Sequence, residues 1–273
     1  MSIQFYVGAE GSGKTYQVVT VVVPEALKQG RRVFTNIPEI NGDLIIQHIK
    51  DNDFQDPQLL KDHKFGFVAY FRSHEIHDNP KFYPDLSDRN FVNMEDLGNL
   101  SQYRVQAGDL FVIDECFEVY HRERKLPLHD ETFFRKHRKY VSPDTKLSTE
   151  IIIMTQDKDA CNKHLLSTVT FTYWASKKEE IGQPNRYNVD VYNGLVKSRD
   201  KPYKQYTLLK YDSHKFSWYK SHAIEGAKQQ SVDTRQNAIT TSKKIQFFAF
   251  PVLLILFLAV SYTHLTLPTN REV

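Results

Sequence analysis

Continuous apolar runs alternate with polar segments along this chain of 273 residues. Four runs stand out, at residues 3–7, 33–37, 110–113 and 151–154. Strands buried on both faces of a parallel sheet have this continuous pattern, whereas half-exposed strands alternate between apolar and polar positions. The first two runs flank residues 16–28, which read as a helix, so we expect a right-handed βαβ unit. The pattern predicts an α/β fold with a mostly parallel sheet.

The stretch from residue 41 to residue 108 is less regular. Leu44–Ile46 and Phe65–Phe71 are apolar enough to form short strands. His74 and His77 are three residues apart, but nothing else completes a metal site, so surface histidines are the simpler interpretation. We expect an insertion before the next core strand, without a catalytic cluster.

Three further strands are predicted after the fourth run. Residues 169–174 alternate in character, and residues 187–192 and 206–211 read as late, antiparallel strands joined by a turn. Before them, residues 132–140 form a basic helix by their pattern. A run of charge of this kind is usually a solvated face.

The end of the chain is strongly apolar at residues 245–260, and no charged residue occurs from Ile245 to Asn270. The run is slightly shorter than the roughly 20 residues that span a bilayer. A buried core helix is the alternative, but nothing after the run is able to cover it. We predict a single transmembrane helix at residues 245–260, after a cytoplasmic domain at 1–222 and a polar linker at 223–244. Lys243 and Lys244 place the N-terminal domain in the cytoplasm by the positive-inside rule.

The last segment, residues 261–273, is similar to the translation of a sequencing adapter. We therefore expect it to be non-native and the membrane helix to be truncated, and we exclude the tail from the fold as one excludes a fusion scar. Comparison of the underlying DNA with the adapter sequence tests this interpretation.

A phosphate-binding motif follows the first apolar run. The pattern G-x-x-x-x-G-K-[ST] is matched by Gly8, Ala9, Glu10, Gly11, Ser12, Gly13, Lys14 and Thr15. Glycines allow the backbone N–H groups to surround an anion at a helix N-terminus. Lysine then reaches the β- and γ-phosphates of ATP, and the Thr15 hydroxyl coordinates Mg²⁺. A glycine turn with a chance lysine is the alternative, but the strand before the motif and the helix after it favour a P-loop NTPase.

Two acids end the third apolar run. Asp114 and Glu115 follow residues 110–113, and the carboxyl end of a parallel strand faces the ligand crevice of α/β proteins. We expect Asp114 to hold Mg²⁺ and Glu115 to polarise the attacking water. An acidic surface turn is the alternative, but the upstream motif favours catalysis because each half of such a site predicts the other.

Four other polar residues are candidates for the same site. Gln156 ends the fourth run and either senses the γ-phosphate or caps the strand. Arg138, or else Arg135, is the candidate to reach the γ-phosphate of a neighbouring subunit. Asn36 either faces the nucleotide or caps a turn, and the two interpretations stand equal.

Composition adds little to this picture. The net charge is +3, so bulk charge gives no argument for nucleic-acid binding. Cys116 and Cys161 are far apart in the sequence and lack metal-ligand spacing, which indicates a reducing compartment rather than a disulfide framework. The first residues form a strand rather than a signal peptide.

The order of these motifs resembles the zonula occludens toxin (Zot) family of filamentous-phage assembly proteins. The resemblance covers residues 1–260 and includes the Gly8–Thr15 motif and the segments 33–37, 112–115, 136–138, 153–156 and 219–222. It implies a single-pass ATPase of the host inner membrane that supports assembly and extrusion of virions. Implied partners are further copies of the chain, other phage assembly proteins, an outer-membrane secretin, and phage DNA or coat protein. Family members often carry an arginine after the Thr-Gln strand, whereas this chain has Asn162, Lys163 and His164 in that region. Arg138 is therefore the preferred candidate for the arginine that reaches the γ-phosphate of a neighbouring subunit.

Two other functions are compatible with the sequence. One is a nucleotide-gated assembly scaffold that binds ATP but hydrolyses little of it. The other is a secreted toxin acting on epithelial junctions, against which the membrane span and the missing signal peptide argue.

Overall fold

A computed structural model describes residues 3–54, 57–79, 81–84, 104–178, 183–197 and 200–220. Within these residues one eight-stranded sheet has the order β3-β2-β4-β5-β1-β6-β7-β8. The strands are β1 (Ile3–Val7), β2 (Val33–Thr35), β3 (Val68–Tyr70), β4 (Leu110–Ile113), β5 (Glu150–Thr155), β6 (Phe171–Lys178), β7 (Gln183–Asn193) and β8 (Lys204–Lys210). In this order, every neighbouring pair from β3 at one edge through β2, β4, β5 and β1 to β6 is parallel. The last two strands, β7 and β8, are antiparallel additions at the other edge. The predicted mostly parallel α/β sheet is therefore confirmed.

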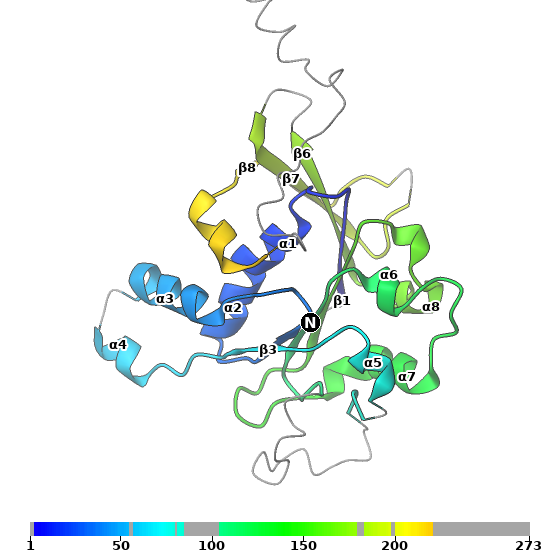
Figure 1. Cartoon of the computed structure of the whole chain (residues 1–273), viewed down its shortest axis with the longest axis horizontal. Coiled ribbons are helices and arrows are strands. Elements are labelled where there is room, and N and C mark those ends of the chain that lie inside the picture. The colour runs from blue at the N-terminus through cyan, green and yellow to red at the C-terminus, as the bar shows by residue number, and fades with distance from the viewer. Residues whose placement is uncertain are drawn as a thin grey trace, which may run out of the picture.

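Helices cover both faces of the sheet (Figure 1). One face carries α1 (Lys14–Gln17), the π-helix η1 (Val18–Val22), α2 (Val23–Lys28) and α3 (Gly42–Asp53). The other carries α5 (Glu75–Asp78), α6 (Cys116–Val119), α7 (Leu128–Lys136) and α8 (Lys163–Leu166). Shorter elements are α4 (Pro57–Asp62) and the 3-10 turns η3 (His137–Lys139), η4 (Lys158–Ala160) and η6 (Ser213–Trp218).

Alternating side chains of the central strands enter two separate cores. In β4, Phe111 and Ile113 join the core under α5–α8, whereas Leu110 and Val112 join the core under α1–α3. All four side chains are fully buried. Successive side chains of a strand point to opposite faces, so a strand between two helical layers must be apolar at every position. This is why the central strands appear as continuous apolar runs.

The first helix is continuous but not uniform. A π-helical segment, Val18–Val22, separates α1 from α2. Pro24 follows it at the start of α2 and has no N–H to continue the α-helical pattern. The Thr20 hydroxyl donates to the Tyr16 carbonyl at 2.7 Å within this segment. The predicted helix at 16–28 is thus confirmed with an irregular middle.

The prediction of a strand at Leu44–Ile46 is wrong, because these residues lie in α3. Asn41 caps this helix, and its side chain accepts a hydrogen bond from the N–H of Leu44 at 3.0 Å. Ile45 and Ile49 are four residues apart and are buried on one face of the helix. The predicted strand at 65–71 is shorter than expected, since only Val68–Tyr70 pair with β2.

After β8 the chain crosses back over the start of the first helix. We call residues 211–220 the strap. The Tyr211 ring packs edge-on against Tyr16 at 4.9 Å between centroids, and the Asp212 N–H donates to the Tyr16 hydroxyl at 2.7 Å. The strap is the gold segment beside α1 in Figure 1.

The strap then reaches the end of β2. The N–H of Asn41 donates to the Trp218 carbonyl at 2.7 Å, and the N–H of Lys220 donates to the Pro38 carbonyl at 3.2 Å. Trp218 is buried in the core under α1–α3. The last described part of the domain is therefore fixed to the same sheet edge that carries the phosphate motif.

The opposite, amino edge of the sheet contains two buried ion pairs. Arg31 contacts Glu150 at 2.9 Å and also donates to the Gly108 carbonyl at 3.0 Å. Arg32 binds the Asp109 carboxylate through two nitrogens, with Nε at 3.0 Å from Oδ1. Bidentate arginine–carboxylate geometry gives both energy and orientation.

In the part of the chain that the structure describes, no helix is long and apolar enough to span a membrane. The predicted transmembrane helix at 245–260, the linker at 223–244 and the tail at 261–273 all lie outside the described residues.

Candidate functional site

The phosphate motif forms a tight turn between β1 and α1. Gly8 is buried, and a Cβ there would lie 2.3 Å from the backbone oxygen of Ala175 on β6. Gly13 has φ +95°, a left-handed conformation that glycine adopts without strain, and it caps α1. Ala9, Glu10 and Gly11 are exposed at the tip of the turn. Glycine is thus required at both ends of the turn, once for a close backbone approach and once for a positive φ.

Lys14 folds back over this turn. Its ammonium donates to the carbonyl of Gly8 at 2.8 Å and to that of Ala9 at 3.1 Å. Burial lowers the pKa of Lys14, while the nearby Glu115 and Asp114 oppose this effect. Among the described residues this buried cation is held by two carbonyls and lies near two carboxylates, so it is suited to an anionic ligand.

Thr15 and Asp114 meet at the carboxyl edge of the sheet. The Thr15 hydroxyl lies 3.5 Å from Oδ2 of Asp114, although the two residues are 99 positions apart. Burial, and then repulsion from Glu115, raises the pKa of Asp114 to about 6. The structure thus brings together the two residues predicted to hold a metal.

The donor chemistry of this pair fits Mg²⁺. A hydroxyl and a carboxylate supply only oxygen, and Mg²⁺ in phosphate sites is held by one or two protein oxygens together with phosphates and water. Among the described residues no cluster of three His, Cys, Asp or Glu side chains offers a complete metal site. Thr15 and Asp114 would hold the ion, which would neutralise phosphate charge when bound.

Glu115 has an unusual backbone. Its φ is +46°, in the left-handed region, which costs a non-glycine residue roughly 1–3 kcal/mol. The strand ends here, and the sharp turn into α6 orients the carboxylate toward Gln156, whose Nε2 donates to Oε1 at 2.8 Å. The second oxygen, Oε2, is buried and has no partner among the described residues.

Gln156 reaches Glu115 because of the order of the strands. β5 lies between β1 and β4, so its carboxyl end is next to both the phosphate turn and the acids. The structure confirms that Gln156 lies at this junction, while its role as a γ-phosphate sensor stays a prediction.

Arg138 lies far from these residues within one chain. It is exposed in η3. Tyr140, the residue after η3, accepts a hydrogen bond from the N–H of Thr149, the residue before β5, so η3 lies near the amino end of β5. The length of β5, about 17 Å at 3.3 Å per residue, separates this edge from the phosphate turn. Arg135, on α7, is paired with Glu131 at 2.9 Å. Neither arginine is placed to act on the nucleotide site of its own chain.

Asn36 has a role that neither sequence interpretation described. Its amide donates to the carbonyl of Asp114 at 2.9 Å and accepts from the N–H of Asp114 at 2.7 Å. It also donates to the Ser73 hydroxyl at 3.0 Å. Asn36 therefore joins the ends of β2 and β4 and holds the backbone of the acid pair.

Tyr211 is a neighbour of the site that sequence reasoning missed. A Cβ at Gly13 would lie 2.6 Å from the Tyr211 hydroxyl, so the strap touches the phosphate turn directly. Burial raises the pKa of Tyr16, which lies under Tyr211. The sequence offers no local signal for this contact, because Tyr211 lies 198 residues after Gly13.

Comparison with known proteins gives one strong match and several weak ones. The family model for zonular occludens toxin (Zot) matches residues 2–226. No curated protein matches the sequence. A crystal structure of the N-terminal domain of zonular occludens toxin from Neisseria meningitidis is 16% identical, with coverage of 81% of this chain and 100% of that chain and a TM-score of 0.43.

A more distant solved structure is the genome packaging NTPase B204 from Sulfolobus turreted icosahedral virus 2 in complex with ATP-gammaS. It is 9% identical, with coverage of 71% of this chain and 98% of that chain and a TM-score of 0.38. The assignment to a family depends on the sequence match alone, which spans the phosphate turn, the acids and Gln156. The chain belongs to the zonular occludens toxin (Zot) family.

Proposed function

We propose that this protein is a P-loop ATPase that works as a membrane-anchored homo-oligomer in the assembly and extrusion of filamentous phage. The observation that carries the proposal is the contact between Thr15 and Asp114 beside the Glu115–Gln156 pair. Two motifs separated by about a hundred residues meet with the groups that ATP hydrolysis requires. Family membership supports the link to phage, and the apolar run at 245–260 supports the membrane anchor.

Each residue has a chemical task in this proposal. The turn from Gly8 to Gly13 and the start of α1 bind the phosphates, and Lys14 supplies a positive charge that stays in the site. Thr15 and Asp114 hold Mg²⁺. Glu115 accepts a hydrogen bond from the attacking water and orients it.

Gln156 links the state of the nucleotide to the fold. Its amide bonds Glu115 in the structure, and a γ-phosphate or its attacking water would compete for the same N–H. Exchange of this partner changes the position of the segment after β5. Arg138 is proposed to act only on the nucleotide of a neighbouring subunit, because its own site is at the opposite edge.

A second candidate is the nucleotide-gated scaffold. The Glu115–Gln156 bond favours it, because Gln156 already occupies one oxygen of the carboxylate that would orient the attacking water. In this case ATP binds and orders an assembly site, and turnover is slow.

Steady-state phosphate release from the full chain separates these candidates. For the ATPase we expect release that falls to background in Lys14→Ala, along with loss of virion release from the host. Lys28→Ala is the matched control, because Lys28 is a lysine further along the same helix that pairs on the surface with Asp53. ATP binding without release in the unmodified chain would favour the scaffold, and virion release by Lys14→Ala would refute the motor.

The membrane anchor needs its own test. We expect the full chain to stay with the inner membrane after alkaline extraction, and a chain ended at residue 244 to be released. Release of both chains would contradict the proposed span at residues 245–260.

A further inference from the structure

The order of the strands determines which way a bound nucleotide points. The acids follow β4, Gln156 follows β5 and the phosphate turn follows β1, so these groups lie side by side along the carboxyl edge. In the proposed function Mg²⁺ and the γ-phosphate lie with the acids. The base is joined through one ribose to the other end of the phosphate chain. It must therefore bind close to the phosphate turn and on the side away from the acids.

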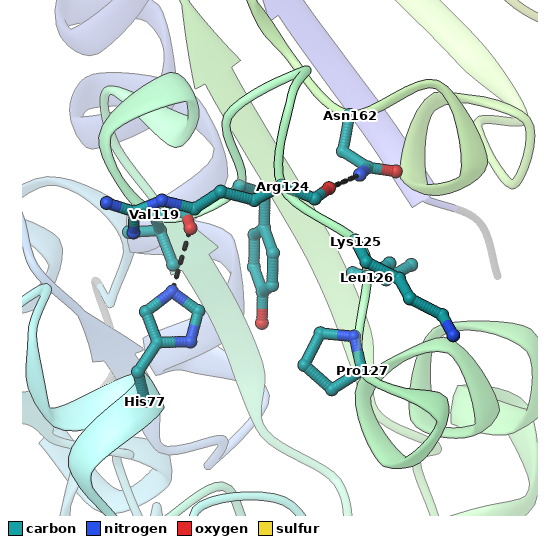
Figure 2. Close-up of a pocket in the computed structure, with 8 residues that line it drawn as sticks. His77, Val119, Arg124, Lys125, Leu126, Pro127 and Asn162 are labelled. Atoms are coloured by element: carbon teal, nitrogen blue, oxygen red, sulfur yellow. Dashed lines mark hydrogen bonds between the residues drawn. The ribbon is translucent and has the colours of Figure 1, made fainter.

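A cavity of about 300 Å³ beside α6 and α8 does not meet this requirement (Figure 2). Its lining includes Val119, Tyr120 and Leu126, which belong to the core under α5–α8, whereas α1 lies on the opposite face of the sheet. Tyr120 and Leu126 are only 2% and 5% exposed, so neither side chain offers a surface to a base. The position of the base is therefore sought on the α1 side.

On the α1 side the strap touches the phosphate turn. Cε1 and Cζ of Tyr211 both lie 3.3 Å from the Cβ position of Gly13. The Tyr211 ring also stacks on Tyr187 of β7, with 4.6 Å between centroids. Contacts on two sides thus hold this part of the strap beside the phosphate turn.

The strap presents the ring of Phe216 next to this contact. Phe216 is 46% exposed, whereas Trp218, in the same 3-10 turn, is 5% exposed. The Phe216 ring packs against Tyr16 with 5.1 Å between centroids and against Tyr211 with 5.7 Å. Single exposed apolar side chains are common, so exposure alone is not evidence of a site. The evidence is the position of this ring, against the first turn of the helix that binds phosphate.

Two charged side chains near Phe216 in the sequence have other partners. The ammonium of Lys215 lies over the Trp218 ring, 5.3 Å from its centroid. The carboxylate of Asp212 accepts a hydrogen bond from the N–H of His214 at 3.0 Å. A planar, uncharged group therefore suits this part of the strap better than a further phosphate does.

We propose that the base of the bound nucleotide stacks on the exposed part of the Phe216 ring while its phosphates lie in the turn from Gly8 to Gly13. The inference rests on the proposed function, because it adds the nucleoside end of the same ligand. Aromatic side chains receive bases by stacking, and the loss of one such contact lowers affinity measurably. Phe216 thus gives the site its preference for a nucleotide over free polyphosphate.

Binding to the full chain is measured with Mg²⁺ and without hydrolysis, as displacement of ADP that carries a fluorescent label on its ribose. The competitors are ADP, which has a base, and pyrophosphate, which has phosphates alone. We expect the unmodified chain to bind ADP at least about tenfold more tightly than pyrophosphate. In Phe216→Leu the affinity for ADP should fall about tenfold, and that for pyrophosphate should stay within about twofold.

Two further variants serve as controls. Phe216→Tyr keeps the ring, so its affinity for ADP should stay within about twofold of the unmodified chain. Phe67→Leu removes another exposed phenylalanine, which is 57% exposed. The Phe67 carbonyl accepts a hydrogen bond from the N–H of Val33, the first residue of β2, so Phe67 lies at the amino edge and its replacement should leave both affinities unchanged. Thermal unfolding of each variant verifies that it is folded.

Several results would overturn the proposal. One is an affinity for ADP in Phe216→Leu that equals that of the unmodified chain, and another is an equal loss in Phe67→Leu. A parallel loss of pyrophosphate affinity in Phe216→Leu would mean that the ring only supports the phosphate turn. Equal affinities of the unmodified chain for ADP and pyrophosphate would mean that no base is bound.

Failure of the proposed function gives a different result. If ADP and pyrophosphate bind as expected while phosphate release from ATP is absent, Phe216 binds the base and the ATPase proposal is wrong. If ATP is hydrolysed and Phe216→Leu binds ADP as the unmodified chain does, the proposal for Phe216 is wrong and the ATPase stands.

Discussion

At the amino edge of the sheet, Arg31 and Arg32 are almost fully buried against the carboxylates of Glu150 and Asp109 and against several carbonyls. At the carboxyl edge, Lys14 is also buried and Asp114 is half-buried, but these two residues have fewer partners. Both edges hold buried charge in the same sheet, and they differ in how completely that charge is compensated.

The carboxyl edge leaves polar groups in unfavourable states. Among the described residues, Oγ of Ser12 and Oε2 of Glu115 are buried without partners. The pKa of Asp114 is raised to about 6 and that of Lys14 is lowered, so both groups are pushed toward their neutral forms. At the amino edge, Nε2 of His137 is also without a partner among the described residues, and burial lowers its pKa. Burial raises the pKa of Asp109 as well, but there the adjacent guanidinium of Arg32 opposes the shift.

The difference indicates what each edge does. A cluster in which each buried charge lies against an opposite charge gains little from a ligand and contributes to the fold. An undercompensated cluster gains from an anion and a cation that complete it, and perturbed groups of this kind gather at functional sites. The following changes test this distinction, in order of decreasing expected effect.

Glu115→Gln should reduce ATP hydrolysis by about 10³-fold, which is about 4 kcal/mol in the activation barrier, because an amide cannot act as a base for water. The glutamine keeps a carbonyl that accepts from Gln156, so the free energy of unfolding should change little. Phosphate release and chemical denaturation measure the two effects. Glu118→Gln, on the exposed side of α6, is the control and should leave both unchanged.

Asp109→Ala should lower the free energy of unfolding by about 3 kcal/mol, because it leaves the guanidinium of Arg32 buried without its carboxylate. Hydrolysis at a temperature where the variant is folded should stay within about twofold. Replacement of both partners, as Arg32→Met with Asp109→Leu, should recover most of the stability. If the double variant is as unstable as Asp109→Ala, the loss comes from the packing of the side chains at this edge and not from an unpaired charge.

Gly13→Ala should lower the free energy of unfolding by about 2 kcal/mol, because the methyl group adds a close contact with Tyr211 to the cost of a positive φ. Gly194→Ala isolates the second cost, since Gly194 has φ +68° and nothing lies within 4 Å of its Cβ position. We expect about 1 kcal/mol there. Equal losses of unfolding free energy at both positions would mean that the contact with Tyr211 adds nothing to the cost at Gly13.

Asp114→Asn should raise the free energy of unfolding by about 1 kcal/mol at pH 7 without Mg²⁺ or nucleotide, because it removes a charge that burial disfavours. Between the ordinary pKa of 3.8 and the raised value of about 6, the folded chain binds a proton that the unfolded chain does not. The stability of the unmodified chain therefore falls as pH rises through this window.

The advantage of Asp114→Asn should then disappear below pH 4, where the aspartate is protonated in both states. Denaturation curves from pH 4 to pH 7 measure this dependence. Asp144→Asn, in an exposed turn, is the control. Loss of stability in Asp114→Asn at pH 7 would mean that the two edges compensate charge equally.

The central site was predictable from sequence because parallel strands set its geometry. Carboxyl ends of parallel strands share one edge, so the turn after residue 7 and the acids after residue 113 had to be close. The same argument predicts that Gln156, at the carboxyl end of β5, lies close to the acids. The continuous apolar runs also predicted the strands well, since burial on both faces leaves no other pattern.

Other features depend on contacts that local sequence does not show. Arg31 and Glu150 are 119 positions apart, and neither has a neighbouring motif that identifies its partner. The three apolar residues Leu44–Ile46 favour a short strand on their own, and it is the Asn41 cap together with the burial of Ile45 and Ile49 on one face that makes this stretch part of α3. Arg138 was placed correctly in a basic helical region, but the edge of the sheet that this region occupies is a property of the fold.

The strap also determines how the domain responds to a pulling force. Tension applied to the chain beyond residue 220 acts first on the hydrogen bonds from Lys220 to Pro38 and from Asn41 to Trp218. Only after these separate does the load reach Tyr211 and Tyr16, at the first turn of the helix that carries Lys14. These two hydrogen bonds, the Lys220–Glu39 ion pair and the buried Trp218 all lie between the remainder of the chain and the nucleotide site, so they would bear such a load before that site does.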